Sequence, residues 1–159
     1  MGSVPSRRLD DRAPKVWRVG GIVHSGLICL IAIGLTVLTK IFDLPWYLPA
    51  IALAIAVMYS VFFVILYPKL RWRRWRYDIH EHEIELMYGI LFVTRTIIPM
   101  VRVQHVDTMQ GPLLRHYGLA TITFSTAAGN HEIPALAVDT ADRARERIAE
   151  LARVSREDV

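Results

Sequence analysis

The sequence has little cysteine, and it lacks charge in two long stretches. Cys29 is the single cysteine, so no intrachain disulfide can form, which fits a cytoplasmic globular part. No Asp, Glu, Lys or Arg occurs in Val19–Leu38 or in Leu48–Tyr67. Each stretch has about 20 residues, or roughly 30 Å of helix, which matches the hydrocarbon thickness of a bilayer. We therefore expect a two-helix transmembrane hairpin that contacts the lipid bilayer directly.

The motifs of common enzyme classes are also missing. There is no Ser–His–Asp motif, P-loop or dinucleotide-binding glycine signature, and no pair of carboxylates lies inside an apolar stretch. The string His80-Glu81-His82-Glu83 is the most metal-like, because two histidines on one face of a strand could ligate zinc. It falls where a hairpin should turn, and no third ligand is close in the sequence. We expect this string to form an exposed polar turn, with a zinc site as the alternative. For the protein as a whole, we expect neither enzyme activity nor a cofactor.

Positive charge is concentrated beside the apolar stretches. The net charge is +3 for residues 1–18 and +5 for residues 69–76, whereas residues 77–159 carry −4. A domain that binds nucleic acid should carry positive charge on its own surface, so no nucleic-acid partner is expected. Cytoplasmic flanks of membrane helices carry the excess of Lys and Arg. This distribution predicts a multi-pass protein of the plasma (inner) membrane with both termini cytoplasmic and the loop Thr39–Tyr47 outside.

These observations divide the chain into four parts. They are a basic cytoplasmic N-terminal segment (1–18), the transmembrane hairpin (19–67, helices about 19–38 and 48–67), a basic juxtamembrane segment (68–76) and a cytoplasmic domain (77–159). The juxtamembrane segment could contact anionic headgroups, each charge near the surface being worth about 1 kcal/mol. Its basic residues are Lys69, Arg71, Arg73, Arg74 and Arg76.

Small residues recur every four positions in both apolar stretches, a spacing that lets helices approach closely. They are Gly21, Ser25 and Cys29 in the first stretch and Ala52, Ala56 and Ser60 in the second. They could pack the hairpin against itself or one protomer against another. His24 lies one turn inside the first stretch, where an ionisable residue is a functional candidate. Its closeness to the basic end also allows a contact with headgroups or a backbone carbonyl.

The part after the basic segment has the patterns of an antiparallel sheet followed by a helix. Apolar and polar residues alternate in Glu83–Tyr88, and Gly89 then separates this run from a β-branched run, Leu91–Ile98. Further candidate strands are Val101–Val106, Leu119–Thr126 and His131–Leu136. A stripe formed by Ala141, Ala144, Ile148 and Leu151 predicts a C-terminal helix at about 140–153 that caps the sheet.

A series of short motifs spaced along this region resembles a known family. The motifs are Arg76-Tyr77, Gly89 with Leu91 and Arg95, Ile98-Pro99, Val103-Gln104-His105-Val106, Gly111-Pro112-Leu113, Gly118-Leu119-Ala120 and Thr126-Ala127-Ala128-Gly129. They resemble the bacterial pleckstrin-homology (PH) domains of YdbS-like membrane proteins, which carry a double transmembrane hairpin before such a domain. The resemblance implies an α+β fold: a transmembrane hairpin, then a PH-like antiparallel sheet or barrel with a capping C-terminal helix.

Two classes of function remain open. The first is a non-catalytic scaffold that self-associates or docks a protein partner, for which a string of loop-type and apolar residues is the candidate surface. That string comprises Met109, Gln110, Pro112, Leu113 and Leu114. The second is an oligomeric transport or immunity component that acts through the hairpin. Full activity of the hairpin without residues 77–159 would favour the second. Binding of anionic headgroups by the basic segment is a weaker alternative.

Overall fold

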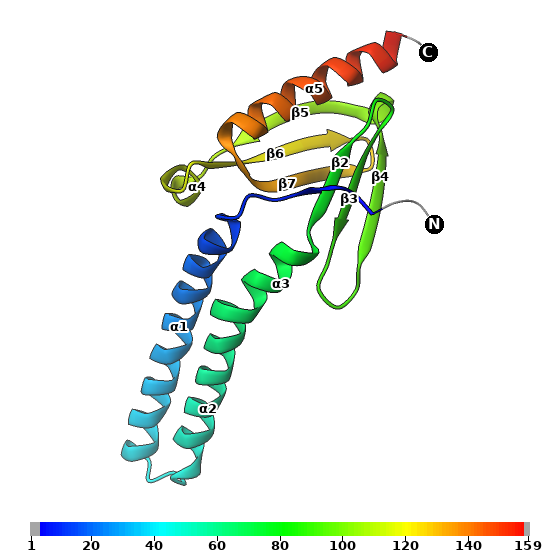
Figure 1. Cartoon of the computed structure of the whole chain (residues 1–159). Coiled ribbons are helices and arrows are strands. Elements are labelled where there is room, and N and C mark those ends of the chain that lie inside the picture. Colours follow the sequence, from blue (N-terminus) through cyan, green and yellow to red (C-terminus); the bar gives the residue numbers. More distant parts are fainter. Residues whose placement is uncertain (1–3, 158–159) are drawn as a thin grey trace. The chain divides into compact units, whose positions relative to one another are not determined.

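The computed structural model describes residues 4–157, which form two compact units (Figure 1). The hairpin unit comprises residues 14–70, and the sheet unit comprises residues 4–13 and 71–157. Apolar helices come first, followed by antiparallel sheets and a C-terminal helix. The predicted α+β class is therefore confirmed.

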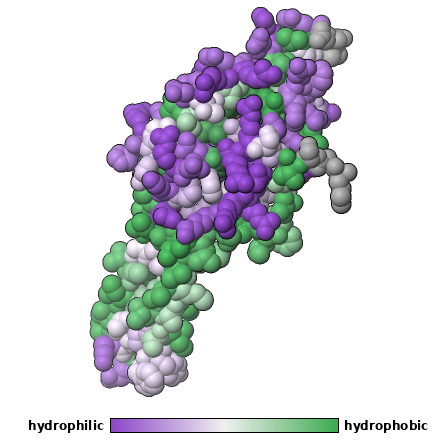
Figure 2. All heavy atoms as spheres, viewed as in Figure 1, coloured by the Kyte–Doolittle hydropathy of each residue, from purple (hydrophilic) through white to green (hydrophobic). Residues whose placement is uncertain are grey.

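The hairpin unit contains most of two long helical stretches, whose ends belong to the sheet unit. Helix α1 spans Ala13–Ile41, and the second stretch runs from Tyr47 to Arg74 as α2 (Tyr47–Val61), a π-helical turn (Phe62–Leu66) and α3 (Tyr67–Arg74). Both exceed the predicted limits, because the absence of charge marks only the apolar part of a helix that continues into its polar flanks. Both are long and apolar enough to cross a membrane. Figure 2 shows hydrophobic residues over the visible face of the hairpin and mainly hydrophilic residues over the sheet unit.

Small residues pack the hairpin against itself. A Cβ added to Gly21 would lie 2.6 Å from the carbonyl oxygen of Phe63, so this position requires glycine. Ser25 and Ala56 are buried, whereas Cys29 is exposed. The predicted small-residue faces thus serve close approach within the hairpin at Gly21, Ser25 and Ala56.

The π-helical turn lies in the second stretch and ends two residues before Pro68. Proline lacks the amide hydrogen that would bond to a carbonyl four residues earlier, so the ladder must rearrange at this point. The amide of Tyr67 donates instead to the carbonyl of Phe62, five residues back. The rearranged turn contains Phe63, whose carbonyl approaches Gly21.

The sheet unit contains two antiparallel sheets. The first has the order β1 (Arg7–Arg8), β2 (Arg76–Ile79), β3 (Glu83–Tyr88) and β4 (Thr94–Pro99). A 3₁₀ turn (Met100–Arg102) leads to the second sheet, which consists of β5 (Val103–Met109), β6 (Leu119–Thr126) and β7 (Gly129–Ala137). Helix α4 (Pro112–His116) joins β5 to β6, and α5 (Val138–Glu157) is the last element that the structure describes.

The core of the sheet unit lies between the sheets and α5. In β3 the buried face carries Ile84 and Leu86, and in β6 it carries Ile122 and Phe124, as the alternating patterns predict. Helix α5 packs across β5 and β6 (Figure 1). Its buried residues are Ala141, Ala144, Ile148 and Ala152. The predicted stripe is confirmed except at its last position, where Ala152 rather than Leu151 is fully buried.

The first strand of this unit comes from before the hairpin. Arg7 pairs with Tyr77 and Arg8 with Arg76, so β1 completes one edge of a sheet that otherwise follows the hairpin. Leu9 and Ala13 are buried, at 3% and 0% exposure. We call residues 4–12 the N-terminal strap. The predicted separate basic segment is thus an integral part of the sheet unit.

The strand predicted at Leu91–Ile98 is wrong in its first three residues. Strand β4 begins at Thr94, and residues 89–93 form a loop that joins it to β3. Gly89 has a φ of +113°, which side chains of L-residues rarely adopt, and a Cβ there would lie 1.9 Å from the carbonyl oxygen of Phe92. The loop therefore closes tightly over Gly89, as the glycine predicted. It leaves Leu91 and Phe92 outside the core, at 90% and 88% exposure.

Candidate functional site

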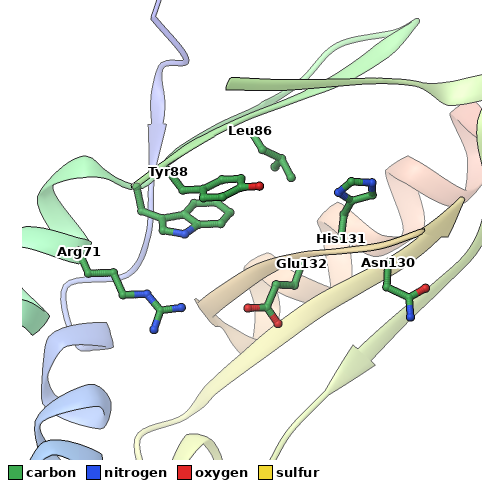
Figure 3. A pocket seen from close by; sticks show the side chains of 7 residues that line it. Arg71, Leu86, Tyr88, Asn130, His131 and Glu132 are labelled. Carbon is green, nitrogen blue, oxygen red and sulfur yellow. The ribbon is translucent and has the colours of Figure 1, made fainter. Parts of the chain in front are cut away.

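A pocket of about 290 Å³ opens in the sheet unit beside the end of the last membrane-flanking helix. Its lining comes from three places: the last turn of α3 with the residue after it, strand β3, and strand β7 (Figure 3). The lining residues are Arg71, Trp75, Leu86, Tyr88, Asn130, His131 and Glu132. No local pattern links these positions, which is why sequence reasoning did not find the pocket.

The pocket has an aromatic wall and a charged rim. Trp75 and Tyr88 stack with ring centroids 5.8 Å apart and planes inclined by 20°. On the β7 side of the pocket, the ring of His131 stacks on the ring of Phe124, with centroids 5.7 Å apart. This stacking holds the imidazole in place. Arg71 and Glu132 bring opposite charges to the rim, and both side chains reach toward the pocket in Figure 3. This lining suits a small group that carries both charges, or a phosphate on the Arg71 side.

The N-terminal strap is fixed to β2 through Asp78. The amide and hydroxyl of Ser6 donate to Oδ2 of Asp78 at 3.2 and 2.8 Å, and Nε of Arg7 lies 3.8 Å from Oδ1. Burial acts to raise the pKa of Asp78, but the hydrogen bonds from Ser6 and from the amide of Ile79, with a smaller effect of His80, outweigh it, so the pKa lies below its ordinary value. The ionised carboxylate therefore holds the strap on the sheet.

A second attachment lies where the strap meets α1. The side chain of Arg12 donates to Oδ1 of Asp10 at 2.9 Å, and this bond holds the pKa of Asp10 below its usual range. Nη1 of Arg12 also donates to the carbonyl of Tyr117 at 2.9 Å, and the indole of Trp72 donates to the carbonyl of Asp10 at 3.1 Å. Gly118, with φ of +64°, lies against this guanidinium. The strap thus joins the end of α3 to the corner that follows α4.

The predicted headgroup-contact residues are placed in different settings. Lys69, Arg73 and Arg74 are exposed on α3, which continues through most of the predicted juxtamembrane segment. Arg71 is half-buried and lines the pocket, and Arg76 lies in β2. Arg71 is therefore distinguished from the other basic residues by its position.

The predicted partner surface is divided between exposed and structural residues. Met109 and Leu113 are exposed, at 59% and 42%, and Pro112 between them begins α4. Gln110 donates from Nε2 to the carbonyl of Leu119 at 2.9 Å, so it holds the corner together. Leu114 is half-buried. The exposed part of the surface therefore consists of Met109, Pro112 and Leu113, which we call the α4 corner.

The metal-like string forms the turn between β2 and β3. The amide of His80 donates to the carbonyl of Glu83 at 2.9 Å, and the side chains of His80, Glu81 and His82 are exposed. The predicted polar turn is confirmed. Within residues 4–157, no group of three or more His, Cys, Asp or Glu side chains is placed to hold a metal ion.

His24 lies on α1 within the hairpin unit. Its side chain is exposed, and Nδ1 donates to the carbonyl of Gly20, one turn earlier, at 2.7 Å. Of the contacts expected from the sequence, the backbone carbonyl is therefore the one that is present. This bond satisfies one ring nitrogen inside an apolar helix.

Comparison with known proteins places the chain in a family. The family model described as "Bacterial PH domain" matches residues 21–152, which include most of the hairpin and strands β2 to β7. The chain is also similar to a Bacillus subtilis (strain 168) protein named "UPF0699 transmembrane protein YdbS", with 46% identity over the full length of both chains. No solved structure matches it. The two long apolar helical stretches, the two antiparallel sheets with a C-terminal helix, and these matches agree: the chain is a membrane protein that belongs to the bacterial PH domain family.

Proposed function

We propose that this chain is a non-catalytic binding module at the inner surface of the plasma membrane. In this proposal the hairpin crosses the membrane twice, both termini are cytoplasmic, and the sheet unit docks a membrane protein or a second copy. The pairing of β1 with β2 supports the topology, because it requires the segments before and after the hairpin to be on one side. The basic residues of both flanks indicate which side that is.

The observation that carries the docking function is the exposed apolar α4 corner. Met109 and Leu113 remain exposed although Gln110 and Arg12 hold the backbone around them in place. A rigid apolar surface is suited to protein binding because little ordering is needed when a partner docks. Since the strap fastens this corner next to the start of α1, a partner embedded in the same membrane can reach it.

Photocrosslinking in native membranes tests this proposal. A photoreactive side chain at position 113 should give a discrete adduct, and the same side chain at the exposed Val154 on α5 should not. The double substitution Met109→Ser and Leu113→Ser should abolish an adduct formed from position 112. An adduct of twice the chain mass identifies a second copy, and any other mass identifies a partner. Equal labelling from positions 113 and 154, or no adduct, contradicts the docking function.

The pocket favours a second candidate function, the binding of a phospholipid headgroup. Arg71 can pair with a phosphate, while Glu132 and the aromatic wall of Trp75 and Tyr88 can accept an ammonium group. A zwitterionic phosphoethanolamine group therefore fits the lining better than an anionic phosphoglycerol group, which Glu132 would repel.

A pair of arginine substitutions separates this function from general attraction to the membrane surface. Binding of short-chain phosphatidylethanolamine to the full chain in neutral detergent should weaken several-fold in Arg71→Gln and change little in Arg73→Gln. Both arginines lie on α3, but only Arg71 lines the pocket. Equal losses would indicate screening of a general basic surface and would reject the pocket as a headgroup site.

The alternative of a transport or immunity component acting through the hairpin requires an oligomer, since two helices cannot enclose a pore. Gly21 and Ala56, which could have served such assembly, are engaged inside the hairpin. This use of the small residues favours the binding module.

A further inference from the structure

The loop between β3 and β4 presents adjacent apolar side chains to solvent. Leu91 and Phe92 are 90% and 88% exposed, and Val93 is 50% exposed. Large apolar side chains that are adjacent and almost completely exposed mark a surface that another phase or molecule covers. The question is what covers this one.

The loop is a defined structure at the tip of a hairpin. Tyr88 pairs with Thr94 at its base, and the backbone turns so tightly over Gly89 that no Cβ could be accommodated there. The loop therefore presents Leu91 and Phe92 in a preformed arrangement, so little conformational entropy is lost when the two side chains enter an apolar phase.

Strand register places this loop at one particular end of the sheet unit. Strand β2 starts at Arg76, directly after α3, and runs away from that helix to the polar turn at His80. Strand β3 runs back, with Met87 opposite Arg76 and Tyr88 stacked on Trp75. Residues 89–93 therefore leave the sheet at the end where the chain enters from α3. The polar turn lies at the opposite end.

The distribution of charge also distinguishes the end of the sheet next to α3 from the end with the polar turn. No Asp or Glu occurs from residue 86 to residue 106. The last turn of α3, at the same end, adds Arg71, Arg73 and Arg74. Basic residues around an exposed Leu-Phe pair are the composition of surfaces that enter the headgroup and acyl boundary of a membrane. The opposite turn carries Glu81 and Glu83, which such a boundary would repel.

We propose that Leu91 and Phe92 insert into the membrane leaflet from which α3 emerges, so that the occupant of this surface is the lipid bilayer itself. The sheet unit is then held at the bilayer at three points: the start of α1, the end of α3 and this loop. Because the first two are covalent, the loop binds at high effective concentration, and two side chains suffice. The inserted loop fixes which face of the sheet unit is turned toward other membrane proteins.

Depth-sensitive probes on the full chain test this inference. In a Cys29→Ser background, Phe92→Cys and the control Glu81→Cys each receive an environment-sensitive fluorophore in nanodiscs of phosphatidylethanolamine and phosphatidylglycerol, one chain per disc. The probe at position 92 should emit at shorter wavelength, be quenched by acyl-chain nitroxides and be protected several-fold from aqueous iodide. The probe at position 81 should show the reverse.

Two results would overturn the proposal. Equal iodide access at positions 92 and 81 would mean that the loop remains in water. Protection at position 92 without quenching by lipid nitroxides would mean that a protein covers it, and loss of that protection on dilution would identify a second copy.

Hydrogen exchange tests the same inference without a label. Leu91→Ser with Phe92→Ser should raise exchange of residues 89–95 several-fold in nanodiscs, and an unchanged rate there would again reject insertion.

Discussion

The two connections of the first sheet differ in almost every property. The turn after β2 is short and polar, with exposed His80, Glu81 and His82, whereas the loop after β3 is apolar and tightly closed over Gly89. Both join neighbouring antiparallel strands, so strand pairing alone does not require the difference. The difference in polarity follows from where each connection lies relative to α3. One connection lies at the end of the sheet where the helix enters, and the other at the far end.

The largest effect is expected from Gly89→Ala, which acts on the apolar loop through its backbone. The added Cβ would collide with the carbonyl of Phe92 at a φ that L-residues rarely adopt. We expect a loss of about 2–4 kcal/mol of unfolding free energy, combining backbone strain with displacement of the loop. Thermal unfolding of the purified full chain in mild detergent measures it.

A second glycine provides the control for this substitution. Gly129 also has a positive φ, +141°, but a Cβ there would meet nothing within 4 Å. Gly129→Ala should therefore cost only the strain, about 1 kcal/mol. If both variants lost the same stability, the close approach at Gly89 would not be what shapes the loop.

The next effect concerns the strands that support the loop. Glu85 is 5% exposed, pairs with Arg95 and lies opposite Asp78 in the register, so it depends on that guanidinium for compensation. Arg95→Ala should destabilise the chain by about 1–3 kcal/mol, because a buried carboxylate loses its partner. Adding Glu85→Gln should restore part of this loss. Additive losses in the double variant would show that the ion pair is not the source.

A smaller, pH-dependent effect is expected where β2 holds the strap. The folded-state pKa of Asp78 and of Asp10 lies below the unfolded value of about 3.9. Both carboxylates therefore stabilise the fold above about pH 4, and this contribution is lost as pH falls through the lower folded-state values. The protection factors of residues 4–12, which are exchange rates corrected for the intrinsic effect of pH, should fall on acidification below that pH.

Substitution of the carboxylate tests the assignment. Asp78→Asn should exchange faster than the parent at neutral pH and respond less to acid. Glu81→Gln, in the exposed turn, should leave both unchanged. An unchanged acid response in Asp78→Asn would mean that other carboxylates hold the strap.

The smallest effect is expected in the polar turn. His80→Ser and His82→Ser change exposed side chains, while the bonds that form the turn use the backbone, including the carbonyl of His82 and the amide of Met100. We expect changes within about 0.5 kcal/mol. A larger loss, or a loss that added zinc reverses, would give the turn a role beyond connection and weaken its contrast with the apolar loop.

Features with a local signal could be predicted from the sequence. The missing charge marked both apolar helices, alternation marked β3 and β6, and the small-residue spacing marked Gly21 as a contact. The loop at Leu91–Val93 was mistaken for strand because its composition is that of a strand. Only the closure over Gly89 takes it out of the sheet.

Features that join distant segments left no local signal. Strand β1 has two residues and no periodicity, and its partner lies beyond the whole hairpin. The pocket likewise combines Arg71 and Tyr88 with residues of β7. The residues of the α4 corner could be selected by composition, but which of them are exposed depends on the bonds of Gln110 and Arg12.

The strap also imposes an order on assembly. Ser6 and Asp78, which it joins, are 72 positions apart, and both apolar helices are synthesised between them. The first part of the sheet unit to be made therefore cannot pair with its partner strand until both apolar helices and β2 have been synthesised. In the proposed topology, a chain whose second helix failed to return across the membrane would leave the strap and β2 on opposite sides, with the edge of β2 unpaired. In that topology, closure of this edge requires that both helices have been inserted, and an unclosed edge would leave β2 open to pairing with another chain.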